Sequence, residues 1–168
     1  MSFWRVYYHL VWATHDRRPL ISPSVEALLF PYLEKKATEF QTVLYAVNGT
    51  EDHIHLVAAI PPRYAVAEVV KSLKGASSHF LNHSSLAIEF SWQRGYGVFS
   101  LGERQRPAAE AYVRAQKEHH RQGTTNAWLE RIEEVDEGPA TPETAVIRES
   151  AAIYRAFGED DIPFQESI

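Results

Sequence analysis

The chain contains no cysteine among its 168 residues. Disulfide bridges and thiolate metal sites are therefore excluded, and a reducing compartment is compatible with the composition. The sequence also lacks an apolar run of the roughly 20 residues that a membrane-spanning helix needs. Residues 1–5 lead into neither the apolar core nor the small-residue cleavage site of a signal peptide. Together these absences predict a cytoplasmic protein with no membrane partner.

A strong basic charge is missing as well, because the formal net charge is −5. The acidic residues are concentrated at one end: residues 129–168 hold 11 acidic and 3 basic side chains, whereas residues 1–128 hold 11 acidic and 14 basic ones. A mildly basic body permits nucleic-acid binding without requiring it. We predict one domain over 1–128 and an acidic, partly helical tail over 129–168. The tail either solubilises the protein, screens a DNA-binding face or adds to a dimer contact.

The hydrophobic pattern predicts four strands and three helices in the first 128 residues. The strands are expected over 3–14, 42–48, 53–60 and at the end of 90–100. The helices are expected from Ser22-Pro23 onward, over 64–82 and over 108–122, and a further short helix at about 143–157. The order β-α-β-β-α-β-α predicts an α+β fold, a ferredoxin-like (RRM-like) antiparallel sheet with two helices on one face, followed by an extra helix.

Two histidines, His53 and His55, occupy alternate positions of the third expected strand. Side chains alternate between the faces of a strand, so both imidazoles should point to the face that the two helices leave open. Two neighbouring imidazoles can chelate one divalent ion. The alternative, two half-exposed histidines without a ligand, stays open on this spacing alone.

Tyr112 and Gln116 stand four residues apart in the last expected helix, and therefore share one of its faces. His119 and His120 lie about one turn further on and are secondary site candidates. This helix is polar for its length, which favours a site over a purely structural role. A tyrosine that packs into the core is the alternative.

Four cationic residues are candidates for contact with DNA phosphates, namely Lys71 and Lys74 on one helix face and Arg17 and Arg18 in a loop. Ordinary solvated positions would explain them equally well. The aromatic side chains of the segment 90–100 could stack on unpaired bases or belong to the core.

Five stretches carry a family resemblance, in order along the chain. They are Tyr8–Thr14 with Arg17-Arg18-Pro19, Asp52–Leu56, Leu73–Ser78, Trp92–Gly97 and Tyr112–His120. Together they resemble the single-tyrosine HUH transposases of the insertion-sequence 200/605 type and the related REP-associated tyrosine transposases. The resemblance covers residues 3–122 and leaves the acidic tail unmatched.

The resemblance implies an enzyme that cleaves and rejoins single-stranded DNA near a hairpin through a 5′-phosphotyrosine intermediate. Tyr112 would be the nucleophile, and His53, His55 and Gln116 would bind Mg²⁺ or Mn²⁺. It also implies a homodimer, in which the tyrosine helix can serve the partner's histidines. The sequence identifies no proton acceptor for Tyr112.

The alternative function is a domesticated protein that binds single-stranded DNA or RNA hairpins without cleaving them. A relaxase or replication initiator is disfavoured by the short chain. A two-histidine phosphoesterase is excluded, because the other closely spaced pair, His79 and His83, lies on an expected helix.

Overall fold

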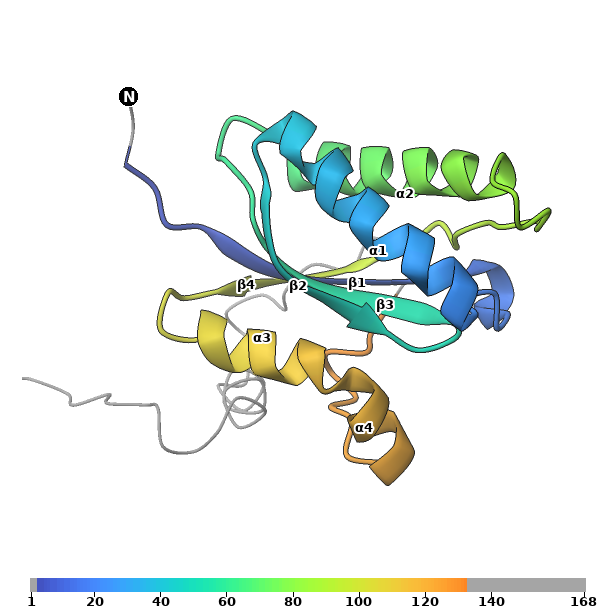
Figure 1. The fold of residues 1–168 in the computed structure, drawn as a ribbon. Coiled ribbons are helices and arrows are strands. Elements are labelled where there is room, and N and C mark those ends of the chain that lie inside the picture. Colours follow the sequence, from blue (N-terminus) through green and yellow to red (C-terminus); the bar gives the residue numbers. More distant parts are fainter. Residues whose placement is uncertain (1–2, 133–168) are drawn as a thin grey trace, which may run out of the picture.

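The computed structural model describes residues 3–132, which form one antiparallel sheet with helices on both faces (Figure 1). The strands are β1 (Tyr7–Ala13), β2 (Val43–Gly49), β3 (His53–Ala59) and β4 (Gly97–Leu101). The helices are α1 (Pro23–Ala37), α2 (Val66–Asn82), α3 (Arg106–Arg114) and α4 (Gln116–Gln122), with short 3-10 helices η1 (His15–Arg17) and η2 (Thr38–Phe40). The helix expected at 143–157 lies outside the described residues.

The strand order is β2-β3-β1-β4, and every neighbouring pair is antiparallel. This order confirms the predicted ferredoxin-like α+β fold. The two central strands, β1 and β3, pair over their full lengths, with Val11 opposite His55 and Ala13 opposite His53. The catalytic candidates of β3 therefore lie at the middle of the sheet, next to β1.

The face of the sheet that α1 and α2 cover holds the larger hydrophobic core (Figure 1). Leu10 and Trp12 of β1 pack there, because residues two apart on a strand share a face. The start of α1 follows the sequence prediction: the Ser22 hydroxyl accepts a hydrogen bond from the Val25 amide, and Pro23 is the first helical residue. In the described range, no helix is long and apolar enough to cross a bilayer.

The opposite face was expected to be open, and this expectation is wrong. Helix α3 packs across β2 and β3, and α4 continues below them (Figure 1). A second core forms there from the other faces of the strands, and Val57, Leu101 and Val113 are among its buried members. The covering has a simple cause, since the apolar stripe of α3 needs an apolar partner surface.

The single helix expected over 108–122 is also wrong, because the chain breaks it at Ala115, whose backbone is at φ −91° and ψ 10°. Neither proline nor glycine lies next to the break, so helix propensity does not explain it. The break coincides with the complete burial of the Gln116 side chain.

The end of the described chain returns to this second face. Leu129 is fully buried in the second core. A Cβ atom on Gly97 of β4 would lie 2.3 Å from the Arg131 carbonyl oxygen, so the close approach of the two backbones requires glycine. Residues 129–132, which the sequence assigned to the acidic tail, thus pack against the folded unit.

Candidate metal and tyrosine site

The two histidines of β3 share a face, as the strand alternation predicts. His53 and His55 point toward α3 and α4, with rings 5.1 Å apart between centroids. Their exposed fractions are only 1% and 0%, so they are buried rather than half-exposed. The turn before them is tight, because a Cβ on Gly49 would lie 2.1 Å from the His53 carbonyl oxygen.

The Nδ1 atom of His53 contacts Asp52 and Thr50, and these contacts orient the Nε2 atom toward the site. The Nδ1 atom lies 2.6 Å from Asp52 Oδ1 and 2.9 Å from Thr50 Oγ1. Burial alone would raise the pKa of Asp52, but hydrogen bonds from His53 and Thr50 lower it to about 2. Burial would lower the pKa of His53, and the hydrogen bond to Asp52 together with the nearby Glu130 carboxylate overcomes this and raises it. Such a carboxylate–imidazole pair typically orients a metal ligand.

His55 is oriented by a third histidine, His9 of β1. The His55 Nδ1 and His9 Nε2 atoms lie 2.9 Å apart, and the two rings stack. Burial lowers the pKa of both imidazoles, so both are neutral near pH 7. When His55 Nδ1 carries the proton, it donates to His9 and leaves the His55 Nε2 lone pair for a metal ion.

His9 is not among the residues predicted from the sequence, although one signal could have identified it. His9 is a polar residue on the face of β1 opposite Leu10 and Trp12. Once β1 and β3 pair, that face is the one that carries the two histidines of β3.

Tyr112 of α3 lies beside the histidines of its own chain. Its ring centroid is 6.4 Å from that of His55, and 6% of the residue is exposed. The hydroxyl donates to Glu130 Oε1 at 3.2 Å and accepts a hydrogen bond from the Asn126 amide at 3.0 Å. Burial raises the pKa of Tyr112, so the phenol is protonated at neutral pH. The His119 ring stacks on that of Tyr112 at 4.7 Å.

Gln116 is fully buried, and neither its amide oxygen nor its amide nitrogen makes a hydrogen bond of good geometry within residues 3–132. The side chain is nevertheless near enough to the Tyr112 hydroxyl to influence its pKa. A buried amide without such bonds costs free energy unless another ligand uses it. Two imidazole nitrogens and an amide oxygen fit Mn²⁺, and also Mg²⁺ when water and phosphate complete its shell.

A carboxylate that was not predicted from the sequence, Glu130, lies among these groups. Glu130 Oε2 is 3.0 Å from His53 Nε2, 3.1 Å from His55 Nε2 and 3.7 Å from His120 Nε2. Ligand atoms of His53, His120 and Glu130 all lie within 4.8 Å of one another. Burial would raise the pKa of Glu130, but the adjacent imidazoles of His53 and His55 lower it well below its usual range. The carboxylate is therefore ionised.

The cationic candidates fall into different environments. The Arg17 guanidinium lies 3.6 Å from an oxygen of Asp52, at the edge of the histidine site, and Arg18 beside it is exposed. Lys71 is exposed on α2. Lys74 differs from the expected solvent-facing pattern: it is buried, its ammonium donates to two backbone carbonyl oxygens, and burial lowers its pKa to about 8.

Lys71 borders a hollow of about 270 Å³ between α2 and the segment 92–96. Arg94, Trp92 and Tyr96 line the same hollow. Positive charge beside aromatic rings is the combination that single-stranded nucleic acid favours.

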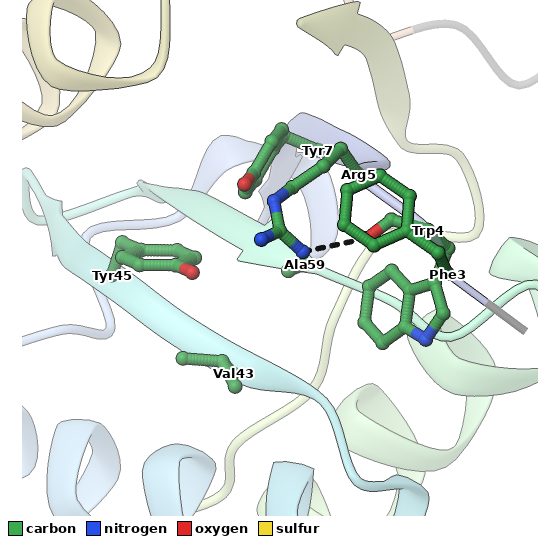
Figure 2. A pocket seen from close by; sticks show the side chains of 7 residues that line it. All are labelled: Phe3, Trp4, Arg5, Tyr7, Val43, Tyr45 and Ala59. Carbon is green, nitrogen blue, oxygen red and sulfur yellow. Dashed lines mark hydrogen bonds between the residues drawn. The ribbon is translucent and has the colours of Figure 1, made fainter. Parts of the chain in front are cut away.

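A second hollow, of about 310 Å³, lies at the far end of β2 and β3 (Figure 2). Aromatic side chains surround it, and the Arg5 guanidinium donates to the Trp4 carbonyl oxygen beside it. Ala59 of its lining is at the opposite end of β3 from His53. The hollow is therefore separate from the histidine site.

Comparison with known proteins connects this geometry to a family. A family model described as "Transposase IS200 like" matches residues 2–116. The ISDra2 transposase TnpA of Deinococcus radiodurans is 25% identical over 119 residues, which cover 67% of this chain and 85% of that protein. The transposase for insertion sequence element IS200 of Salmonella typhimurium is 27% identical over 126 residues, 71% of this chain and 82% of that protein.

Solved structures agree with the fold. A crystal structure of a Deinococcus radiodurans protein assigned as a transposase is 26% identical, with a TM-score of 0.56, and covers 69% of this chain and 95% of that one. A REP-associated tyrosine transposase bound to a REP hairpin shares the fold at 13% identity, with a TM-score of 0.54, and covers 74% of this chain and 76% of that one.

Proposed function

The chain belongs to the IS200-like transposase family, and from this premise we propose that it cleaves and rejoins single-stranded DNA through a covalent link to Tyr112. The observation that carries the proposal is that His55 lies beside both His53 and Tyr112, while the buried Gln116 is near enough to the Tyr112 hydroxyl to influence its pKa. The sequence places these residues on two distant elements, β3 and the α3–α4 pair, and the fold brings them together.

In the proposed cleavage step, the Tyr112 oxygen attacks the scissile phosphorus and loses its proton. The bond between phosphorus and the 3′ oxygen breaks, and that oxygen gains a proton. The products are a 5′-phosphotyrosine and a free 3′-hydroxyl. Because the phosphotyrosine preserves the phosphodiester's energy, a 3′-hydroxyl can reverse the step on another end without ATP.

We propose that His53, His55 and Gln116 hold the divalent ion. When bound, Mg²⁺ or Mn²⁺ would polarise the scissile phosphate and stabilise negative charge in the transition state. The protein's own contribution is orientation. Asp52 fixes the ring of His53, and His9 fixes the ring of His55, while α3 holds Tyr112 beside the His55 ring and α4 begins at the buried Gln116. This arrangement keeps the nucleophile and the ligands rigid relative to each other.

We also propose that the substrate contains a hairpin. The REP-associated relative was solved with a REP hairpin, and the hollow beside Lys71 offers charge and aromatic rings for one. Arg17, next to Asp52, is positioned for a phosphate near the site, with Arg18 beside it.

Lys71→Ala is expected to weaken binding to all hairpins equally and to reduce the slope of log affinity against log salt by about 1.

We propose that the protein forms the homodimer that the family resemblance implies. Because Tyr112 lies on the histidines of its own chain, each subunit carries the whole set of candidate catalytic residues. Light scattering during chromatography would measure the oligomeric state. Mixing Tyr112→Phe with His53→Ala subunits would show whether residues of two subunits combine into an active site.

The decisive experiment incubates the protein with Mn²⁺ and single-stranded hairpin DNA from its own genomic flanks. A covalent protein–DNA adduct that resists SDS is expected for the wild type and for Tyr32→Phe, a control tyrosine of α1. No adduct is expected for Tyr112→Phe or His53→Ala. An adduct with Tyr112→Phe would disprove the assigned nucleophile. Hairpin binding without any adduct would instead support the non-cleaving binding protein.

A further inference from the structure

Glu130 occupies a position that neither the family match nor the sequence pattern anticipates. It lies beyond residues 2–116, the part of the chain that the family model matches. Its segment is nevertheless well anchored, because Leu129 is buried in the second core and the Arg131 backbone packs against Gly97. The carboxylate is thus held by the fold rather than placed on a free tail.

The two oxygens of this carboxylate have different neighbours. Oε2 is 3.0 Å from His53 Nε2 and 3.1 Å from His55 Nε2, the two nitrogens that the outer partners leave for a metal ion. Oε1 accepts the hydrogen bond of the Tyr112 hydroxyl at 3.2 Å. One side chain therefore connects the metal-binding nitrogens with the nucleophile.

These distances match those between neighbouring atoms of one coordination shell. In the octahedral shell of Mg²⁺, ligand atoms lie about 2.1 Å from the ion, so adjacent ligands are about 3.0 Å apart. The chemistry agrees, because Mg²⁺ and Mn²⁺ prefer hard oxygen ligands. His53, His55 and Gln116 offer no negative charge when the imidazoles are neutral, and Glu130 supplies one.

We propose that Glu130 is a fourth protein ligand of the catalytic divalent ion, binding through Oε2 while Oε1 orients the Tyr112 hydroxyl. This inference rests on the proposed function, since it concerns the same ion. A carboxylate in this place raises the affinity for the ion. It also holds the nucleophile at a constant distance from the ion, because both contacts come from one rigid group.

The competing role is inhibition, in which the Glu130 carboxylate occupies the position of the ion or of the scissile phosphate and so prevents its binding. The two roles give opposite results when the carboxylate is removed. A ligand lost from the shell weakens Mn²⁺ binding, whereas removal of an inhibitory carboxylate strengthens Mn²⁺ binding and increases adduct formation.

The test measures Mn²⁺ binding to the full chain by calorimetry, in the absence of DNA. Glu130→Gln keeps the shape of the side chain and one oxygen, so Mn²⁺ binding about tenfold weaker is expected. Glu130→Ala removes both oxygens and should weaken Mn²⁺ binding about 100-fold, the upper end of the affinity losses seen when groups around a metal are mutated. The control Glu39→Gln removes an exposed carboxylate that pairs with Lys36 at the end of α1, and should bind like the wild type. His53→Ala should lose binding.

A second readout separates coordination from folding. The electron paramagnetic resonance spectrum of Mn²⁺ at saturation should change for Glu130→Gln, since the symmetry of the shell changes, and the melting temperature of the metal-free variant confirms that it is folded. The inference would be overturned if Glu130→Gln had the affinity and the spectrum of the wild type while His53→Ala lost binding. That outcome would leave the proposed function intact. Tighter binding by Glu130→Ala would also overturn it. A wild type that binds no Mn²⁺ would overturn both.

Discussion

The hydrogen bond between His9 and His55 has a consequence that can be measured. If His9 accepts the proton of His55 Nδ1 at 2.9 Å, it keeps the Nε2 atom of His55 available for the metal. In His9→Phe the acceptor is gone, while an apolar ring of similar size faces Phe99. The buried Nδ1–H of His55 then has no partner in the orientation that binds the ion.

The expected magnitude follows from the cost of that unsatisfied donor. A buried donor left without a partner costs about 1–3 kcal/mol, which corresponds to about 5- to 150-fold in Mn²⁺ affinity. His9→Gln places an amide oxygen where His9 Nε2 was, and its affinity should stay within about threefold of the wild type. The metal-free stability of His9→Phe should not fall in parallel, because His9 Nδ1 is itself buried without a hydrogen bond in the described chain.

Calorimetric titration with Mn²⁺ measures the affinity, and ¹⁵N NMR of the imidazoles reports which nitrogen of His55 carries the proton. Wild-type affinity in His9→Phe, together with an unchanged tautomer of His55, would refute the reasoning. Equal losses in His9→Phe and His9→Gln would do so as well, because they would show that shape rather than the acceptor matters.

Three further predictions follow from the site. Asp52→Asn removes the carboxylate that orients its neighbouring imidazole, and Mn²⁺ affinity measured by calorimetry should fall about 10- to 100-fold. The pKa values of His9 and His55 are lowered in the fold, so the unfolded chain binds protons that the folded chain does not. The contribution of these two histidines to metal-free stability should therefore be full above pH 6.5 and decrease as the pH falls below it, by up to about 1.4 kcal/mol per pH unit for each histidine. Urea unfolding at several pH values checks this, and His9→Gln should show a smaller slope. Gly97→Ala forces the terminal segment away from β4 and should lower both the melting temperature and Mn²⁺ affinity, whereas Gly75→Ala, on an α2 position with open space around it, should stabilise the protein by about 0.5–1 kcal/mol.

The fold was predictable because its elements follow short-range rules. Alternation in β1 and β3 and the Ser22-Pro23 helix start are visible in the sequence, and the element order leads to the observed sheet. What the sequence did not show depends on tertiary contacts. The break at Ala115 has no local signal, and the covering of the second face follows from α3 packing against strands remote in sequence.

The candidate site divides in the same way. His53 and His55 were predicted to share a face because they lie on one strand, and Tyr112 and Gln116 because they stand four residues apart. His9 and Glu130 were missed because each meets the site only through long-range pairing, by the β1–β3 register in one case and the close packing on Gly97 in the other. Lys74 was assigned to a solvent-facing pattern because helical spacing does not reveal that α2 turns it toward backbone carbonyls.

The register of β1 with β3 also determines which face of the sheet the histidines occupy after folding. If β3 slipped by one residue, its histidines would move into the apolar layer under α1 and α2, and Ile54 and Leu56 would leave it. Such a misaligned chain would bury two imidazoles without partners and expose apolar surface, so it would be strongly disfavoured. The free energy that selects the correct strand register thus also places the two histidines on the face where Tyr112 lies.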